Sequence, residues 1–190
     1  MKPEEFVALV RETFAFLERE YGFSFSWTDG YCVHFNSPNV FVSVMYDATR
    51  SYELSVDIGQ VGTAGHPFEL WTILRAAGRG ELLEAKTAIS SQASDLPQHL
   101  ERLASLFKQY ASNLFTGDTH LFKALGQQRD ADDAAYALET ILSRARQKAE
   151  KNWKQKEYGE VVKQLELLEI HLSPSEKKML DIARKRSQSN

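Results

Sequence analysis

The feature that most constrains the fold of this chain is a change in the period of its apolar residues near Pro67. Before that point, apolar and polar residues alternate, as they do from Val40 to Tyr46. Side chains of a strand point alternately to opposite faces, so this period of two predicts strands with one buried face. After that point, apolar residues recur every three to four positions, which predicts helices. The sequence therefore predicts an α+β fold with an all-helical C-terminal half.

The first third of the chain predicts a small antiparallel sheet. A polar turn at Asp47-Ala48-Thr49-Arg50 joins the last two strands as a hairpin. A helix over about residues 3–20 precedes the strands, and it is expected to cover one sheet face because an apolar face must be buried. The prediction is an N-terminal helix packed on a four-strand antiparallel meander, with strands at 23–27, 31–35, 40–46 and 52–58.

The rest of the chain predicts a series of helices. Ser173-Pro174-Ser175-Glu176 combines a capping box with proline at the first helical position, and so predicts the start of the last helix. The expected organisation is an α+β meander over 1–66, helices packed on or beside it over 67–129, and a compact helical array over 130–190. The preceding helices are predicted from Pro67 to Gly78, from Ser94 or Asp95 to Leu114, from Thr119 to Leu125, from 134 through Trp153 and from Val161 to Leu172, with helical character around Leu82–Ala88.

Composition argues against several classes of function. The 190 residues include 23 Lys or Arg and 26 Asp or Glu, and the net charge of −3 argues against a nucleic-acid partner. The longest apolar run is too short to cross a bilayer, so no membrane partner is expected. The chain begins Lys2-Pro3-Glu4-Glu5 without an apolar leader, and a cytoplasmic location is therefore expected.

The sequence shows no catalytic constellation and no metal site. The five histidines form no pair at helical spacing and no H-E-x-x-H motif. Cys32 is the only cysteine and lies in an apolar strand, where a buried structural thiol is expected; His34 is interpreted as a structural histidine. Asp130, Asp132 and Asp133 precede a predicted helix, whose N-terminus their charge would stabilise without a ligand. We expect no metal and no cofactor.

Three glycines, Gly59, Gly62 and Gly65, join the last strand to the helix predicted at Pro67. Backbone amides of such a loop and of a helix N-terminus can bind phosphate, which makes Gly62, Gly65 and His66 a candidate anion site. The spacing is not the dinucleotide motif G-x-G-x-x-G, however, and no Lys-Ser or Lys-Thr follows. A flexible connector is the interpretation we favour.

The best candidate surface lies on the hairpin of the last two strands. Glu53 and Asp57 share one parity of their strand and are expected on its more solvated face, while Arg50 is placed to pair with Asp47 across the turn. Tyrosine and arginine are typical interface anchors. A solvated sheet face with a turn ion pair would also carry these residues. The predicted partner-binding residues are Tyr46, Asp47, Arg50, Tyr52, Glu53 and Asp57.

The segment from Trp153 to Arg186 resembles part of a tetratricopeptide repeat (TPR). Lys156-Glu157-Tyr158 matches the turn, Val161-Val162 and Leu165 match the second helix, and Leu172-Ser173-Pro174 matches the exit. The match extends over about one repeat, whereas stable solenoids stack about three or more. The resemblance implies a TPR-like helical hairpin and does not by itself imply a peptide-binding groove.

A second resemblance concerns the segment 31–59, which ends Tyr52-Glu53-Leu54-Ser55-Val56-Asp57-Ile58-Gly59. This segment resembles small bacterial α+β proteins of the immunity type. Such proteins neutralise a toxin, so the resemblance implies recognition of one protein partner.

Two functions of different classes therefore remain open. The first is a non-catalytic protein-binding protein, of the immunity or adaptor type, with one protein partner of unknown identity. The alternative is an enzyme of unrecognised class with an anion or phosphate site at the Gly59–Gly65 loop and the following helix N-terminus. The sequence favours the first function and does not fix the oligomeric state.

Overall fold

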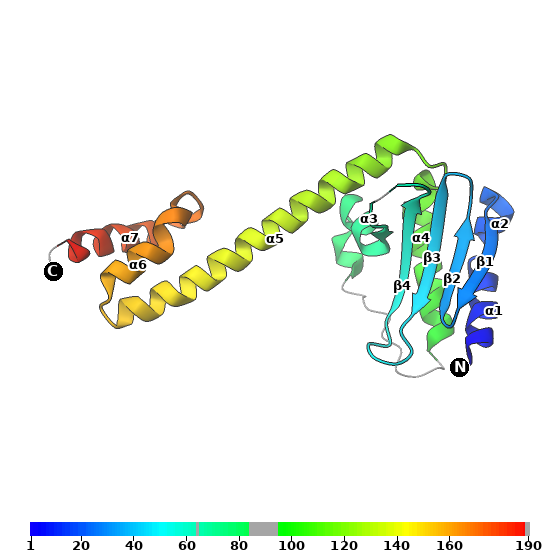
Figure 1. Cartoon of the computed structure of the whole chain (residues 1–190), viewed down its shortest axis with the longest axis horizontal. Coiled ribbons are helices and arrows are strands. Elements are labelled where there is room, and N and C mark those ends of the chain that lie inside the picture. Colours follow the sequence, from blue (N-terminus) through cyan, green and yellow to red (C-terminus); the bar gives the residue numbers. More distant parts are fainter. Residues whose placement is uncertain (64, 84–94, 189–190) are drawn as a thin grey trace. The chain divides into compact units, whose positions relative to one another are not determined.

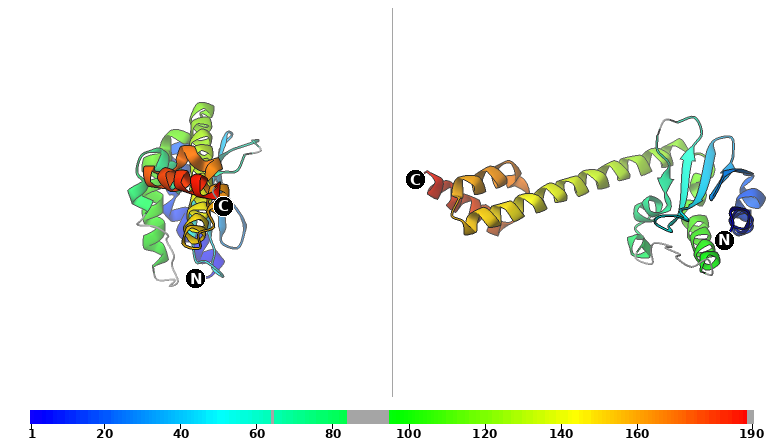
Figure 2. Two further views of the ribbon diagram at one scale, coloured as in Figure 1. Left: turned by 90° about the vertical axis from the view of Figure 1, so that its left-hand side faces the viewer. Right: turned by 60° about the horizontal axis from the view of Figure 1, so that its bottom comes forward.

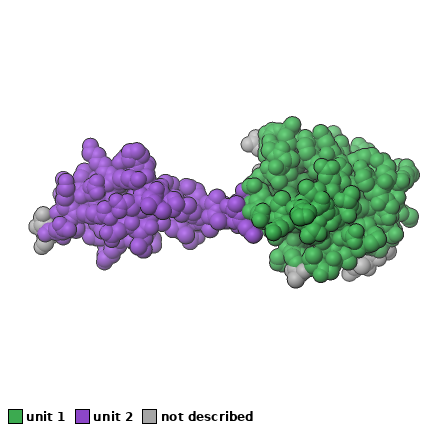
Figure 3. All heavy atoms as spheres, turned by 90° about the horizontal axis from the view of Figure 1, so that it is seen from above, with its two compact units in different colours: residues 1–129 green, residues 130–190 purple. Residues whose placement is uncertain are grey.

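The computed structural model describes residues 1–63, 65–83 and 95–188. It contains two compact units, Met1–Arg129 and Asp130–Asn190, which are coloured separately in Figure 3. The predicted α+β class with a helical C-terminal half is confirmed. In chain order the elements are α1 Pro3–Thr13, α2 Ala15–Tyr21, β1 Ser24–Asp29, β2 Cys32–Asn36, β3 Val40–Tyr46, β4 Leu54–Gln60, β5 Phe68–Glu69, α3 Leu70–Ala76, the 3₁₀ turn η1 Gly80–Leu83, α4 Leu96–Ala111, η2 Ser112–Leu114, α5 Thr119–Lys154, α6 Tyr158–Leu165, η3 Glu166–His171 and α7 Pro174–Ser187.

The sheet of the first unit has five antiparallel strands in the order β1-β2-β3-β4-β5. Strands β1 to β4 are labelled in Figure 1. The four predicted strands are present, each displaced by at most two residues at an end. The fifth strand corrects the prediction, because a helix was expected to begin at Pro67. Phe68 instead pairs with Ile58 and extends the apolar face of the sheet. Pairing with a neighbouring strand thus outweighs the local helical signal.

One face of the sheet is covered by α1, α2 and α4 (Figures 1 and 2). Phe6 and Val10 of α1 and Phe107 of α4 are fully buried in this core. The predicted helix over 3–20 is present but is divided at Phe14, whose backbone leaves the helical region. The sheet residues buried on this face are Val33, Phe35, Val40, Val42, Val44, Leu54, Val56, Ile58 and Phe68. Residues of the predicted segments 1–66 and 67–129 share this single core.

Helix α5 corrects two predicted helix boundaries. Gly126 was expected to end one helix and residue 134 to begin the next, but α5 is continuous from Thr119 to Lys154. Glycine inside a helix costs about 1 kcal/mol relative to alanine, a small cost that the good helix formers Ala, Leu, Gln and Arg on either side of Gly126 offset. Residues 127–135 also contain no Gly or Pro. The cluster Asp130–Asp133 therefore lies inside a helix, and its predicted role at a helix N-terminus is wrong.

The second unit has a core of its own. Leu142, Ala145 and Ala149 of α5 pack with α6 and α7. The predicted capping box is confirmed, since Glu176 N–H donates to Ser173 Oγ at 3.3 Å and Ser173 N–H donates to Glu176 Oε2 at 2.7 Å. The other members of this core are Val161, Leu165, Leu172, Leu180 and Ala183.

The start of α4 matches one of its two predicted caps, because α4 follows Asp95 directly. The helical character predicted around Leu82–Ala88 lies for the most part outside the described residues, and the 3₁₀ turn η1 ends at Leu83.

Candidate functional site

The sheet face turned away from α1 and α4 carries a row of polar residues. Ser26 is the cross-strand partner of His34, and His34 is the partner of Ser43. Ser43 in turn pairs with Asp57, and Asp57 pairs with Glu69. Directly opposed residues share a face, so these five residues, which we call the polar row, cross the whole sheet on one side. Helices α1, α2 and α4 pack on the other side of the sheet, whereas Trp71 of α3 donates a hydrogen bond to Glu69 of the polar row.

His34 connects the polar row to Cys32. The imidazole Nδ1 lies 2.9 Å from Ser43 Oγ, and Nε2 lies 3.3 Å from Cys32 Sγ. A neutral imidazole carries one N–H, so donation from Nδ1 to Ser43 leaves the Nε2 lone pair facing the thiol. Cys32 was expected to be buried but is only half-buried, because it points to the polar face and not into the core.

Asp57 is the residue of the polar row whose burial shifts its pKa. Its exposed fraction is 7%, and its Oδ1 has no hydrogen-bond partner. Burial raises the pKa of this carboxyl to about 6, and the neighbouring charge of Glu69 acts in the same direction. Glu69 itself accepts a hydrogen bond from the indole N–H of Trp71. Asp57 was expected on the more solvated face of its strand; it lies on the uncovered face but is nearly inaccessible there.

The polar row does not contain an activated nucleophile. Burial, together with the charge of Asp57, raises the pKa of the Cys32 thiol, so Cys32 stays protonated at neutral pH. Ser43 is 5% exposed, which leaves its hydroxyl almost closed to a substrate. Within 1–63, 65–83 and 95–188, no three His, Cys, Asp or Glu side chains converge on a position that could hold a metal ion.

The hairpin turn between β3 and β4 holds most of the predicted partner-binding residues. Asp47 organises this turn, because its carboxylate accepts hydrogen bonds from the backbone N–H groups of Thr49, Arg50 and Ser51 and from the hydroxyls of Thr49 and Ser51, at 2.9–3.3 Å. These bonds, led by the one from Thr49 N–H, hold the pKa of Asp47 well below its usual range. Arg50 thus contacts Asp47 through its backbone, and the predicted ion pair across the turn is not formed.

Three of the predicted residues are displayed together at this turn. Arg50, Tyr52 and Glu53 are all exposed. Tyr52 has φ +56°, a left-handed conformation that is uncommon for a residue other than glycine. The backbone hydrogen bond from Asp47 N–H to Glu53 O, at 3.0 Å, closes the turn around it. The turn is therefore a fixed loop with exposed aromatic and charged groups.

The remaining two predicted residues lie elsewhere. The ring of Tyr46 packs against Phe6 of α1 at a centroid distance of 5.9 Å and against Tyr31 at 5.7 Å, on the helix-covered side. Asp57 lies on the opposite face of the sheet. The structure therefore divides the predicted surface into the turn, one residue beneath α1 and one residue in the polar row.

The geometry expected for the anion site is absent. The helix that follows the glycine connector begins at Leu70, not Pro67, and the residue that caps it is Glu69, whose carboxylate disfavours an anion. His66 is exposed, and its carbonyl accepts a hydrogen bond from Arg129 Nη1 at 3.3 Å. Gly62 and Gly65 lie in the exposed connector before β5. The premise that a helix N-terminus follows this loop directly is wrong.

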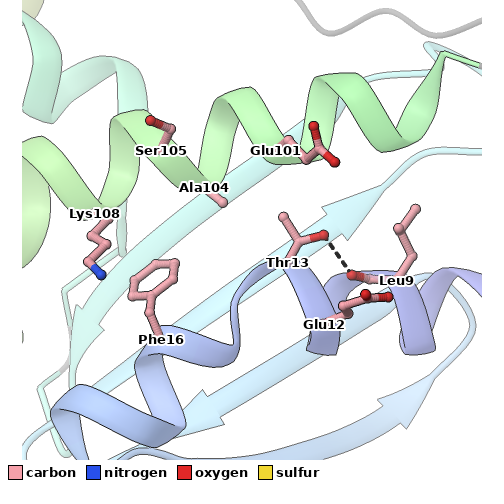
Figure 4. A pocket seen from close by; sticks show the side chains of 8 residues that line it. All are labelled: Leu9, Glu12, Thr13, Phe16, Glu101, Ala104, Ser105 and Lys108. Carbon is pink, nitrogen blue, oxygen red and sulfur yellow. Dashed lines mark hydrogen bonds between the residues drawn. The ribbon is translucent and has the colours of Figure 1, made fainter.

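A shallow groove of about 450 Å³ lies between α1 and α4 on the helix layer (Figure 4). Phe16 and Lys108 meet at one end, with Lys108 Nζ 5.2 Å from the ring centroid of Phe16. Thr13 Oγ1 donates to the carbonyl of Leu9 at 2.8 Å and is thereby satisfied within its own helix. None of the residues that line the groove has a buried polar atom without a hydrogen-bond partner, which would point to a ligand.

The second unit displays two large aliphatic side chains. Leu167 is 91% exposed and Ile170 is 82% exposed. Both lie on η3, where residues three apart fall on the same side. Arg184 Nη2 holds η3 to α7 through Glu169 Oε2 at 2.8 Å and Glu166 Oε1 at 3.2 Å. The pair is thus an exposed apolar spot on a fixed support.

The contacts of the His34 ring with Cys32 and Ser43 were not predicted from the sequence. The signal was present in part, because a Cys-x-His sequence in a strand places both side chains on one face. The approach of Ser43 and Asp57 depends on strand register, which the alternation of apolar residues leaves open.

Comparisons with protein-family models, with curated proteins and with solved structures found no match to this chain. The TPR-like and immunity-type resemblances therefore rest on the residues that suggested them. Among the helices in the described part of the chain, none is long and apolar enough to cross a membrane.

Proposed function

We propose that this is a non-catalytic protein-binding protein of the immunity or adaptor type, which recognises one protein partner through the turn between β3 and β4. The observation that carries the proposal is a fixed turn that exposes interface-type side chains. The Asp47 carboxylate ties down the turn backbone, while Arg50, Tyr52 and Glu53 remain exposed.

The physical argument is one of preorganisation. Ordering a loop on binding costs free energy, and a loop that is already ordered avoids that cost. Tyrosine and arginine are enriched among the residues that dominate binding energy, and charges at the rim steer the approach of a partner. We further propose that binding takes place in the cytoplasm, which fractionation of host cells would test.

The test is affinity purification from the host with the full-length protein, followed by mass spectrometry. The double variant Arg50→Glu/Glu53→Lys keeps the net charge and reverses both charges at the turn. A matched control, Glu150→Lys/Lys154→Glu, makes the same kind of exchange at an exposed ion pair of α5. We expect one protein to be recovered with the wild type and with the control, and to be lost with the turn variant.

Two other outcomes would contradict the proposal in different ways. Undiminished recovery with the turn variant would show that the turn is not the binding surface; the TPR-like hairpin and its Leu167 and Ile170 would then be the next surface to test. Recovery of no protein above background at low salt, even with the wild type, would contradict the binding function itself.

A further inference from the structure

Three residues with metal-binding side chains lie on the polar face of the sheet, on the adjacent strands β2 and β3. Cys32 and His34 are two residues apart on β2, and Sγ lies 3.3 Å from Nε2. Met45 of β3 is the direct cross-strand partner of Cys32. Tyr46 N–H donates to Tyr31 O at 3.0 Å, so the adjacent pair Cys32–Met45 is of the non-hydrogen-bonded type, in which side chains approach most closely.

We propose that Cys32, His34 and Met45 form a binding site for a soft monovalent cation, Cu(I). Thiolate and thioether sulfurs favour Cu(I), and imidazole binds copper as well. A thioether ligand distinguishes this set from the Cys, His and carboxylate ligands that Zn²⁺ takes. The long, unbranched methionine side chain can adapt its sulfur position to an ion held by the other two groups.

The spacing of the first two donors fits one shared ion. Metal–sulfur and metal–imidazole bonds are about 2.3 and 2.0 Å long in protein zinc sites. Their sum exceeds the 3.3 Å between Cys32 Sγ and His34 Nε2, so the two atoms are close enough to contact one ion. Both residues are half-buried, which leaves the pair accessible from the uncovered face.

The surroundings of His34 also suit a metal ligand. Histidines that bind metals use the other ring nitrogen to donate to a fixed partner, which sets the tautomer and ring orientation. Ser43 Oγ, 2.9 Å from Nδ1, supplies that partner, and Ser43 is held in place by its burial. A His34 ring oriented in this way presents the Nε2 lone pair on the side of Cys32.

A buried carboxylate without a partner supplies an independent reason to expect a cation. Asp57 Oδ1 has no hydrogen-bond partner, although its residue is more than nine-tenths buried. Asp57 lies on the same face of the sheet as Cys32 and His34, so a cation bound on this face would offset its charge.

Binding changes protonation and not oxidation state. The Cys32 S–H bond breaks, its proton passes to solvent, a sulfur–copper bond forms, and the copper remains Cu(I). The copper site does not involve the turn between β3 and β4. Its test is therefore independent of the test of the proposed protein-binding function.

The test is anaerobic titration of the full-length protein with Cu(I), in competition with a chromophoric Cu(I) chelator. We expect one equivalent of Cu(I) to be retained by the wild type and lost by Cys32→Ala. Met45→Leu preserves side-chain volume and should weaken retention, with a shift of the Met45 methyl NMR signal on Cu(I) addition as a second readout. Ser43→Ala removes the partner of Nδ1 and should weaken binding by about 10-fold or more.

Two controls keep the proposal falsifiable. Met179→Leu alters a half-buried methionine of the second unit and should bind like the wild type, while far-UV circular dichroism checks that each variant is folded. Retention of Cu(I) by folded Cys32→Ala would overturn the site. Equal retention by the wild type and Met45→Leu, or a preference for Zn²⁺ over Cu(I), would overturn its assignment to a soft monovalent ion.

Discussion

The two faces of the sheet are built from alternate residues of the same strands, yet they differ in almost every physical respect. On the helix-covered face, Val33, Phe35 and Val44 are fully buried among apolar side chains. On the other face, His34, Ser43 and Asp57 form a polar row in which one carboxylate oxygen has no partner. The first face supplies burial of apolar surface, the main stabilising term in folding. The second carries an ionisable group at a cost in stability, which is common at functional sites.

The largest expected change in the free energy of unfolding tests whether the helix-covered face contributes more to stability than the polar face. Phe35→Ala removes a fully buried ring and should lower the free energy of unfolding by about 3–5 kcal/mol. Phe41→Ala is the matched change on the polar face, where the half-buried ring lies over Gly59. We expect a clearly smaller loss for Phe41→Ala in urea unfolding. Equal losses would mean that both faces are packed alike and would remove the contrast.

Asp57→Asn is expected to change the free energy of unfolding by an intermediate amount, and this change should depend on pH. The carboxyl has a pKa of about 6 in the folded protein against an ordinary value of 3.8, so its ionisation opposes folding. The wild type therefore loses stability as pH rises from about 4 to 6, and at neutral pH Asp57→Asn should be more stable, on the order of 2 kcal/mol.

Below about pH 4 both forms of residue 57 are neutral, so the advantage of Asp57→Asn should vanish there. Urea unfolding at pH 3.5, 5 and 7.5 would measure this change, with Asp133→Asn, an exposed residue of α5, as the control. An Asp57→Asn advantage that is independent of pH would show that ionisation of this carboxyl is not its cause.

The smallest expected effect on stability concerns the turn that joins β3 to β4. Tyr52 has φ +56°, and a left-handed conformation costs roughly 1 kcal/mol for a residue with a side chain. Tyr52→Gly should therefore raise the melting temperature slightly, and Tyr52→Asn should lie between the two because asparagine tolerates this conformation. Thermal unfolding followed by circular dichroism would order the three proteins. A lower melting temperature for Tyr52→Gly would show that contacts of the tyrosine ring outweigh the backbone strain.

Some elements were predictable because their signals are local. The capping box at Ser173 fixes the start of α7 through hydrogen bonds between residues three apart, so no other part of the chain is needed. The alternation from Val40 to Tyr46 likewise assigns each residue of β3 to one of two faces. Gly126 shows the limit of such signals, because good helix formers on either side continue α5 through a residue that often ends a helix.

The candidate sites were predictable only in part. Arg50 was predicted in the turn from the polar composition of residues 47–50, whereas Tyr52 and Glu53 were predicted in the last strand and lie in the turn before β4 instead. The surroundings of Asp57 were not found, because burial of a polar residue depends on the neighbouring strands. In the predicted surface Tyr46 and Asp57 were grouped, but their positions in the strand pair place them on opposite faces.

The sequence by itself determined that this chain builds an antiparallel sheet followed by helices, since hydrophobic period and capping are properties of short segments. Only the tertiary structure decided that Ser43 lies between His34 and Asp57, and that Met45 lies opposite Cys32. A one-residue change of register would keep every strand and yet move these side chains to the other face or to other partners. Strand register is set by contacts between segments distant in the sequence, and no single segment contains that information.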